Sequence, residues 1–179
     1  MGEPRLSPPE RVHPFWTFSL ALYARAGVEP ACLALQDAGA DVNLLLLCCW
    51  LGSTGRQLER PALERLRRAA SPWQAELLEP LRRARRAVKA GIAGLAPESG
   101  ETLRCGILAA ELDAEYLEQT FLADLALPLA SAAETGGQAA AINLGRYLGL
   151  LAIDAAADRH AQVLLSACGA GAPGAAAAI

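Results

Sequence analysis

The side chains of this chain best suited to bind another molecule lie in one short basic stretch: Arg82, Arg83, Arg85, Arg86 and Lys89. A guanidinium presents a planar fork of N–H donors that matches a phosphate or a carboxylate. Because neutralised phosphates drive nucleic-acid binding, RNA or a ribosome is one candidate partner. However, no aromatic residue lies among these basic residues to stack on bases, and the whole chain is acidic, with a net charge of −3. An acidic helix of the same chain, or an anionic protein, therefore fits the stretch better than nucleic acid.

The chain supplies such an acidic helix itself. Residues 56–89 hold ten basic and four acidic side chains, whereas residues 90–179 hold three basic and ten acidic ones. Glu111, Glu115 and Glu118 follow one another at steps of four and three, so they share one side of a helix. We expect this helix and the basic one to lie side by side, with their opposite charges either paired or facing solvent.

The same glutamates do not predict a metal centre. Carboxylate-bridged metal sites in helical bundles combine Glu with a Glu-x-x-His motif. The two histidines, His13 and His160, lie outside such a motif, and the five cysteines show no C-x-x-C spacing. The adjacent Cys48 and Cys49 lie in an apolar run, where cysteine behaves as a small hydrophobic residue. The sequence therefore predicts no metal and no cofactor, and it identifies no catalytic residue.

Three polar residues stand alone in apolar surroundings: Ser19, Gln36 and Asn43. Structural hydrogen bonds explain such residues most simply, and Asn43 is close enough to Asp41 to help satisfy the same helix terminus. The alternative is that the three line a pocket between the first helix and the central helix, which would make the protein an enzyme. The question of enzymatic activity stays open at this point, with a non-enzymatic role favoured.

The central helix is predicted at residues 42–51. Asp41 is a good N-cap, eight apolar residues follow Asn43, and Gly52 can end the helix in the left-handed conformation. A helix that is apolar on every side needs protein or lipid around it. Ten residues rise only about 15 Å, half of a bilayer core of about 30 Å. We therefore expect a buried scaffold helix in a chain that does not span a membrane.

Proline, glycine and apolar periodicity place the other elements. Helices are predicted at 15–26, 29–37, 61–70, 71–90 (with a kink at Pro80), 101–126 and 138–167 (with a break near Gly145 or Gly149). Two of them carry an apolar stripe at steps of three and four: Leu77, Leu81, Ala84 and Val88 in the first, and Leu103, Ile107, Ala110, Ala114, Leu117 and Phe121 in the second. Two helices with such stripes are expected to pack as an antiparallel hairpin.

The predicted fold is thus a single all-α bundle of about seven helices. The composition agrees, since 53% of the residues are hydrophobic and alanine and leucine far outnumber β-branched residues. We expect residues 1–12 to form a flexible proline-rich arm, residues 13–168 the domain and residues 169–179 a disordered Ala/Gly/Pro tail. A first stretch without the apolar segment of a signal peptide, and cysteines without a disulfide pattern, favour a bacterial cytoplasmic protein.

Several segments in order resemble an uncharacterised proteobacterial family known only as a conserved domain of unknown function. They are Phe15-Trp16-x-Phe18-Ser19-Leu20, Cys32-Leu33-x-Leu35-Gln36-Asp37, Asp41-Val42-Asn43-Leu44 and the run from Trp73 through Pro80-Leu81-Arg82 to Lys89. The resemblance covers about residues 15–120. It implies a small helical cytoplasmic protein and brings no activity, cofactor or catalytic residue.

The leading hypothesis is therefore a non-enzymatic protein-interaction or regulatory module that binds a protein partner or a second copy of itself. The second is an RNA- or ribosome-associated protein that uses the arginine-rich helix 82–89. The third is an enzyme with the pocket described above.

Overall fold

The structure, a computed structural model, describes residues 11–133 and 138–169. Its α-helices are α1 (Pro14–Tyr23), α2 (Val28–Asp37), α3 (Val42–Ser53), α4 (Arg60–Pro72), α5 (Glu79–Ala90), α6 (Pro97–Ala126), α7 (Ala139–Gly149) and α8 (Arg159–Gly169). A π-helical segment, Trp73–Leu78, joins α4 to α5 without a break, and a 3-10 turn, Leu127–Leu129, follows α6. Counted as uninterrupted rods, the described residues form seven helices, and the predicted all-α class is confirmed.

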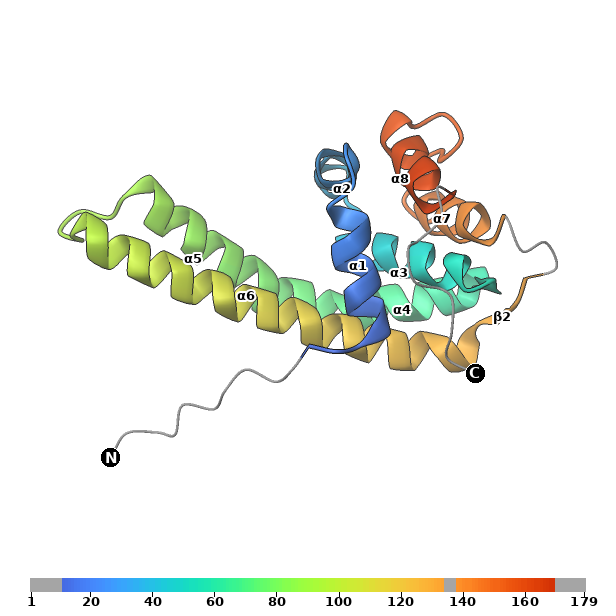
Figure 1. Ribbon diagram of the computed structural model, residues 1–179, viewed down its shortest axis with the longest axis horizontal. Coiled ribbons are helices and arrows are strands. Elements are labelled where there is room, and N and C mark those ends of the chain that lie inside the picture. The colour runs from blue at the N-terminus through green and yellow to red at the C-terminus, as the bar shows by residue number, and fades with distance from the viewer. Residues whose placement is uncertain (1–10, 134–137, 170–179) are drawn as a thin grey trace.

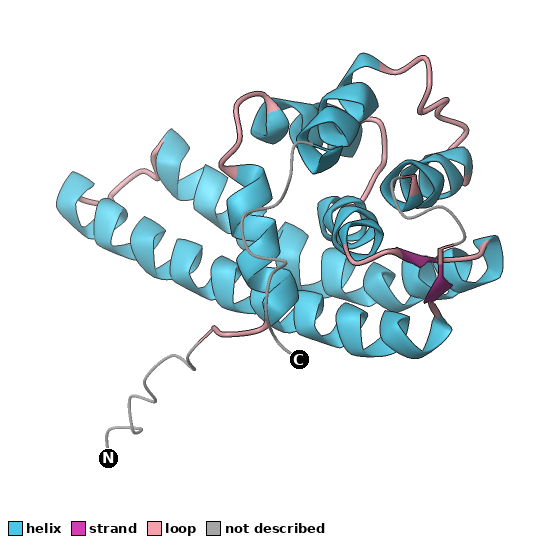
Figure 2. Ribbon diagram, turned by 45° about the vertical axis from the view of Figure 1, so that its right-hand side comes forward, coloured by secondary structure: helices cyan, strands magenta, loops and turns pink. Residues whose placement is uncertain are grey.

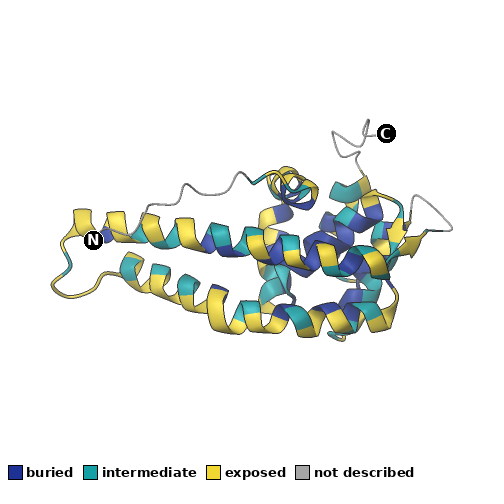
Figure 3. Cartoon of the chain, turned by 90° about the horizontal axis from the view of Figure 1, so that it is seen from below, coloured by how far each residue is buried: buried dark blue, intermediate teal, exposed yellow. Residues whose placement is uncertain are grey.

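Two long antiparallel rods form the floor of the molecule (Figure 1). One is α4, the π segment and α5, and the other is α6. The remaining helices, α1, α2, α3, α7 and α8, lie on one side of this floor, over the end that contains α4 (Figure 1). We call these five helices and α4 the body, and residues 73–126 the hairpin. The hairpin projects beyond the body, and its free end is mostly exposed, whereas buried residues gather under the body (Figure 3).

Helix α3 lies at the centre of the body. Nine of its twelve residues are buried, and it contacts α1, α2, α6, α7 and α8. Asp41 caps it as predicted, because its carboxylate accepts the backbone N–H groups of Asn43 at 2.8 Å and Leu44 at 3.3 Å. Each of these neighbours buries apolar surface against α3, and the hydrophobic effect therefore holds the body together around this helix.

Gly52 has a different role from the one predicted. It does not end α3 in a left-handed turn, since the helix continues to Ser53. A Cβ at Gly52 would lie 2.3 Å from Cα of Ala140. The glycine is therefore required where α3 and α7 cross, because any side chain there would push the two helices apart.

The predicted start of a new helix at Ser71 and Pro72 is wrong. Pro72 has helical dihedral angles, φ −62° and ψ −37°, so its ring fits the helix and the rod continues. Near Pro80, where a kink was predicted, the rod contains the π segment, which ends two residues before the proline. A proline ring clashes with the carbonyl four residues earlier, here Glu76, and a widened π turn relieves that clash.

Several boundaries also differ from the predictions. Helix α1 covers residues 14–23, and α6 begins at Pro97, which shortens the predicted loop of the hairpin. The last helical region is broken as expected, after Gly149, and a turn with Ala152 at φ 58° separates α7 from α8. These ends depend on tertiary contacts, which local sequence patterns do not contain.

A two-stranded sheet of two residues per strand pairs β1 (Arg56–Gln57) with β2 (Ser131–Ala132) (Figure 2). The fully buried Asn143 ties this sheet to the core. It accepts the N–H of Leu58 at 2.9 Å and donates to the carbonyl oxygens of Arg56 at 2.9 Å and Cys48 at 3.3 Å. Strands this short leave no alternating pattern, so the sequence did not predict them.

The predicted arm and tail fall mainly at residues 1–10 and 170–179, which lie outside the described residues. The end of the predicted arm is held in place: the guanidinium of Arg11 pairs with Asp113 of α6 at 2.5 Å and lies over the ring of Trp16. Across the described ranges, no single helix has the length and apolar character needed to cross a bilayer, although α1 and α2 together, bent by 100°, satisfy both criteria.

Candidate functional site

The basic stretch is divided between two environments. Arg82 donates to Glu115 at 2.8 Å and to Glu111 at 3.3 Å, and Arg85 donates to Glu111 at 2.6 Å. The predicted antiparallel hairpin is therefore closed by these ion pairs, in which Glu111 is only 7% exposed. Two of the five candidate partner-binding residues are thus engaged within the hairpin and are not presented to RNA or to an acidic protein.

The other three basic side chains remain at the surface. Arg83 and Lys89 are exposed, and the exposed Arg86 pairs with Glu79 at 2.6 Å on its own helix. Exposed pairs of this kind contribute little to stability, so they leave Arg86 available to exchange partners. The hypothesis of an arginine-rich contact to RNA therefore rests on three residues instead of five.

Asn43 does not help to cap α3, contrary to the prediction. Its amide nitrogen donates to a carboxylate oxygen of Glu118 at 2.6 Å, and its amide oxygen accepts from Gln119 at 2.9 Å. Asn43, Glu118 and Gln119 are all buried. The residue therefore connects the start of the central helix to α6, because a buried amide must have partners for both of its ends.

The hydrogen bonds continue into the hairpin. Gln74, in the π segment, donates to both carboxylate oxygens of Glu118 at 3.0 and 3.2 Å. The oxygen of Gln74 in turn accepts from Arg82 at 3.3 Å. A connected polar cluster thus runs from Asn43 through Glu118, Gln74 and Arg82 to Glu111, and it joins the body to the hairpin.

The charges of this cluster affect one another. Burial, followed by the nearby charge of Asp41, raises the pKa of Glu118 to about 8. Burial also raises the pKa of Asp41, against the two backbone N–H bonds that lower it. Burial lowers the pKa of Arg82, but its bonds to Glu115 and Glu111 outweigh that effect, and its pKa is raised. Arg82 therefore stays charged, and Glu118 binds a proton more tightly than an exposed glutamate does.

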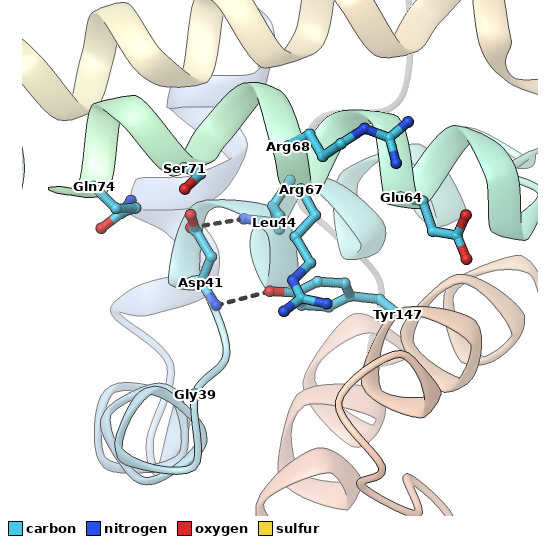
Figure 4. A pocket seen from close by; sticks show the side chains of 9 residues that line it. All are labelled: Gly39, Asp41, Leu44, Glu64, Arg67, Arg68, Ser71, Gln74 and Tyr147. Carbon is cyan, nitrogen blue, oxygen red and sulfur yellow. Dashed lines mark hydrogen bonds between the residues drawn. The ribbon is translucent and has the colours of Figure 1, made fainter.

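A cleft lies beside the cluster, between the connection from α2 to α3 and the long rod of α4, the π segment and α5. Its two cavities, of about 400 and 490 Å³, share the four residues Gly39, Asp41, Ser71 and Gln74. Figure 4 shows the first of them, with the hydroxyl of Tyr147 accepting the backbone N–H of Asp41 at 2.8 Å. The two cavities form one groove along the polar face of the rod.

The three candidate pocket residues are not brought together by the fold. Gln36 lines the second cavity, whereas Ser19 and Asn43 line neither cavity. Among the described residues the buried hydroxyl of Ser19 has no hydrogen-bond partner, and both ends of the Asn43 amide are bonded within the polar cluster. The cleft lies between the α2–α3 connection and the rod, and of the three candidate side chains only that of Gln36 lines it.

Cysteine, histidine and carboxylate side chains are the common metal ligands, and cysteine is also a common nucleophile. In the part of the chain that the structure describes, no three His, Cys, Asp or Glu side chains are placed to hold a metal ion. All five cysteines are free thiols, and burial raises the pKa of Cys32 to about 12. A thiol with such a pKa is a poor nucleophile, because the thiolate is the reactive form.

Sequence reasoning missed three residues of this region: Gln74, Tyr147 and Arg67. Tyr147 is 106 residues from Asp41, to which it bonds, so no local pattern connects them. Gln74 and Arg67 resemble ordinary surface residues of a helix in the sequence. A weak signal did exist, since Arg67, Ser71 and Gln74 are spaced at steps of four and three on one face of the rod.

The structure thus defines a small all-α protein with a projecting hairpin, a buried polar cluster at its base and a cleft beside it. The family model described as protein of unknown function (DUF2390) matches residues 14–122, and the chain belongs to this family. The match contains the polar cluster from Asp41 to Glu118 and ends before Tyr147. No curated protein and no solved structure matches the chain.

Proposed function

We propose that the protein is a non-enzymatic interaction module that associates with a second copy of itself through the outer face of its hairpin. The observation that carries this proposal is an apolar face left uncovered on both rods. Leu77, Leu103, Leu117 and Phe121 are 39–50% exposed, and all belong to the two predicted stripes. The tilted ring contact between Trp73 and Phe121, at 5.9 Å, extends the face toward the body.

The position of this face follows from the helical periodicity of α6. Its residues Glu118 and Leu122 are buried toward the body, and Glu111 is buried against Arg82 and Arg85 of the other rod. Leu103 and Leu117 lie on the other side of the seam between the two rods and are exposed. Along this part of α6, Glu111 and Glu118 are therefore buried while Leu103 and Leu117 are exposed, which is the reverse of the usual arrangement for a surface helix.

A second copy suits this face for two reasons. The four exposed residues of this face are uncharged, so a two-fold axis that places them against one another brings no like charges together at its centre. The nearest carboxylates on α6, Asp113 and Asp124, lie one turn away at the edge of the face. In addition, two antiparallel helices form half of a four-helix bundle, and a second hairpin supplies the other half with the same spacing.

The available area is sufficient for a specific dimer. The nineteen residues from Leu103 to Phe121 extend about 27 Å, and two helices side by side are about 20 Å wide. The footprint is then about 500 Å² on each copy, or about 1,000 Å² in total, which reaches the lower limit for a stable protein interface.

The test is the oligomeric state, measured by sedimentation velocity over a range of concentrations. We expect a dimer for the unmodified chain and a monomer for the double variant Leu103→Glu with Leu117→Glu, because charges would oppose one another across the two-fold axis. Leu33→Glu is the matched control, since Leu33 is 46% exposed but lies on α2, in the body. The control should remain a dimer.

A strictly monomeric unmodified chain at high concentration would refute the proposal. So would a dimer that survives the double variant, or one that Leu33→Glu disrupts equally. RNA added at low salt serves as a further arm. A complex with RNA that needs Arg83 and Lys89 would favour the second hypothesis instead.

A cytoplasmic location forms part of the same proposal. The free thiols of Cys32, Cys48 and Cys49, all buried, support it, because such thiols are typical of a reducing compartment. Fractionation of the native host, followed by detection with an antibody, tests the location directly. Recovery of the protein in an extracytoplasmic fraction would contradict it.

A further inference from the structure

In the first cavity of the cleft, shown in Figure 4, most hydrogen-bond acceptors of the lining residues have partners, whereas several donors do not. It is lined by Gly39, Asp41, Leu44, Glu64, Arg67, Arg68, Ser71, Gln74 and Tyr147. Its volume of about 400 Å³ lies within the range of pockets that hold small molecules. The polar groups without partners indicate what the cavity can bind.

Its acceptors are largely occupied. One carboxylate oxygen of Asp41 accepts two backbone N–H groups at the start of α3. Glu64 pairs with Arg60, one turn earlier on α4, at 3.3 Å. The amide oxygen of Gln74 accepts from Arg82 at 3.3 Å.

Its donors are largely free. Arg67 and Arg68 are exposed, and neither has an ion-pair partner among the described residues. The oxygen of Tyr147 accepts the N–H of Asp41, so the phenolic hydrogen is left to donate, and the described part of the chain offers it no acceptor. Tyr147 is only 1% exposed, so an unused donor there is costly unless something else accepts it.

These donors belong to one place. Arg67 lies close enough to Tyr147 for its charge to act on the phenol, and the two side chains meet at the cavity in Figure 4. Ser71 is one turn further along α4 than Arg67 and adds a hydroxyl to the same wall. In Figure 4 the guanidinium of Arg67 points to Tyr147, whereas that of Arg68 points away from both. One guanidinium and two hydroxyls therefore line this space, and their complement is an oxygen-rich anion.

We propose that this cavity binds a small oxyanion, a phosphate or carboxylate group, held by Arg67 and by the hydroxyls of Tyr147 and Ser71. The proposal is independent of dimer formation, since the cavity lies between the α2–α3 connection, α4 and α7, away from the outer face of the hairpin. Phosphate and carboxylate share the required chemistry, and the experiment below distinguishes them.

The test is isothermal titration of the full chain, at low ionic strength in a chloride buffer, with inorganic phosphate and separately with succinate. We expect saturable binding at one site for at least one of the two, and the anion that binds more tightly identifies the source. Arg67→Gln should weaken that binding about tenfold or more, because it removes a charge-assisted hydrogen bond. Tyr147→Phe should weaken it several-fold while the ring continues to fill the core.

Arg65→Gln is the matched control. Arg65 is exposed on the same helix, carries the same charge and does not line the cavity. It should leave the affinity unchanged within about twofold. Absence of saturable binding for both anions would overturn the proposal, and so would an equal loss of affinity in Arg65→Gln and Arg67→Gln, since that result would indicate attraction by overall charge.

Discussion

The body and the hairpin use opposite arrangements of polar and apolar residues. In the body, the leucines of α3 are buried. The side chains of Asp41 and Asn143, two polar residues of the body, accept hydrogen bonds from backbone N–H groups. In the hairpin, Glu111 is buried against Arg82 and Arg85, while Leu117 remains half exposed. The contrast indicates that the body is stabilised mainly by apolar burial, whereas the hairpin is oriented by ion pairs and leaves apolar surface for another contact.

The largest difference is expected from truncating one aliphatic side chain in each region. Leu45→Ala in α3 removes a fully buried side chain from a tightly packed core and should lower the free energy of unfolding by about 2–5 kcal/mol. Ile92→Ala, at the tip of the hairpin, removes a side chain that is already 49% exposed and should cost less than about 1 kcal/mol. Urea denaturation with an unchanged m-value measures both, and equal losses would erase the comparison.

Two helical glycines provide a second matched pair. Gly52→Ala places a methyl group against the backbone of Ala140 and should destabilise the protein by about 1–3 kcal/mol. Gly106→Ala, in α6, meets nothing within 4 Å and should stabilise it by about 0.5–1 kcal/mol, because alanine favours the helix. The melting temperatures of the two variants should therefore move in opposite directions. A shift in the same direction would show that α3 and α7 do not cross as closely as described.

The ion pairs of the hairpin can be compared among themselves. Arg82→Gln leaves Glu115 without its partner and the buried Glu111 with Arg85 alone, and we expect a loss of about 2 kcal/mol. Arg86→Gln removes an exposed pair and should cost no more than about 0.5 kcal/mol. Chemical denaturation at low and at high salt provides the measurement. Should Arg86→Gln prove the more harmful, the assignment of the hairpin's orientation to Arg82 would be wrong.

The buried Glu118 should also make the free energy of unfolding depend on pH. The pKa of Glu118 is raised to about 8 in the folded state, above its ordinary value of 4.5, so the folded protein binds this proton more tightly than the unfolded chain does. Between these two values the stability should fall as the pH rises, by at most about 1.4 kcal/mol for each pH unit, and no further loss from this group follows above the upper value.

Glu118→Gln should flatten that part of the profile, because glutamine does not titrate. Denaturation midpoints measured from pH 5 to pH 8 test this expectation for the variant beside the unmodified chain. Glu76→Gln is a useful control, since Glu76 is exposed in the same region of the rod. An unmodified protein whose stability rises over this range would contradict the burial of Glu118.

Features that depend on local sequence patterns were predicted better than features that depend on tertiary contacts. Asp41, the apolar run after it and the periodic stripes of Leu81 and Leu103 are local patterns, and they correctly predicted the buried helix and the antiparallel pairing of the two rods. The stripes themselves do not form the contact between the rods, since Leu103 and Leu117 are exposed. Gly52 and Pro72 were misread, because each has an ordinary local meaning that a tertiary contact or a continuing helix overrides. The role of Asn43 was misread for the same reason, since its partners are 75 and 76 residues away.

The sequence by itself determined the class of fold, the buried central helix, the pairing of the two long rods and the family to which the chain belongs. Helix periodicity, capping and the hydrophobic effect act over a few residues, so they can be read along the chain. Only the tertiary structure decided that Arg82 and Arg85 bind Glu111, that Asn43 bonds to Glu118, and that Tyr147 meets Asp41 beside Arg67. Such pairings depend on the register and rotation of one helix against another, which close packing fixes only when the whole chain has folded.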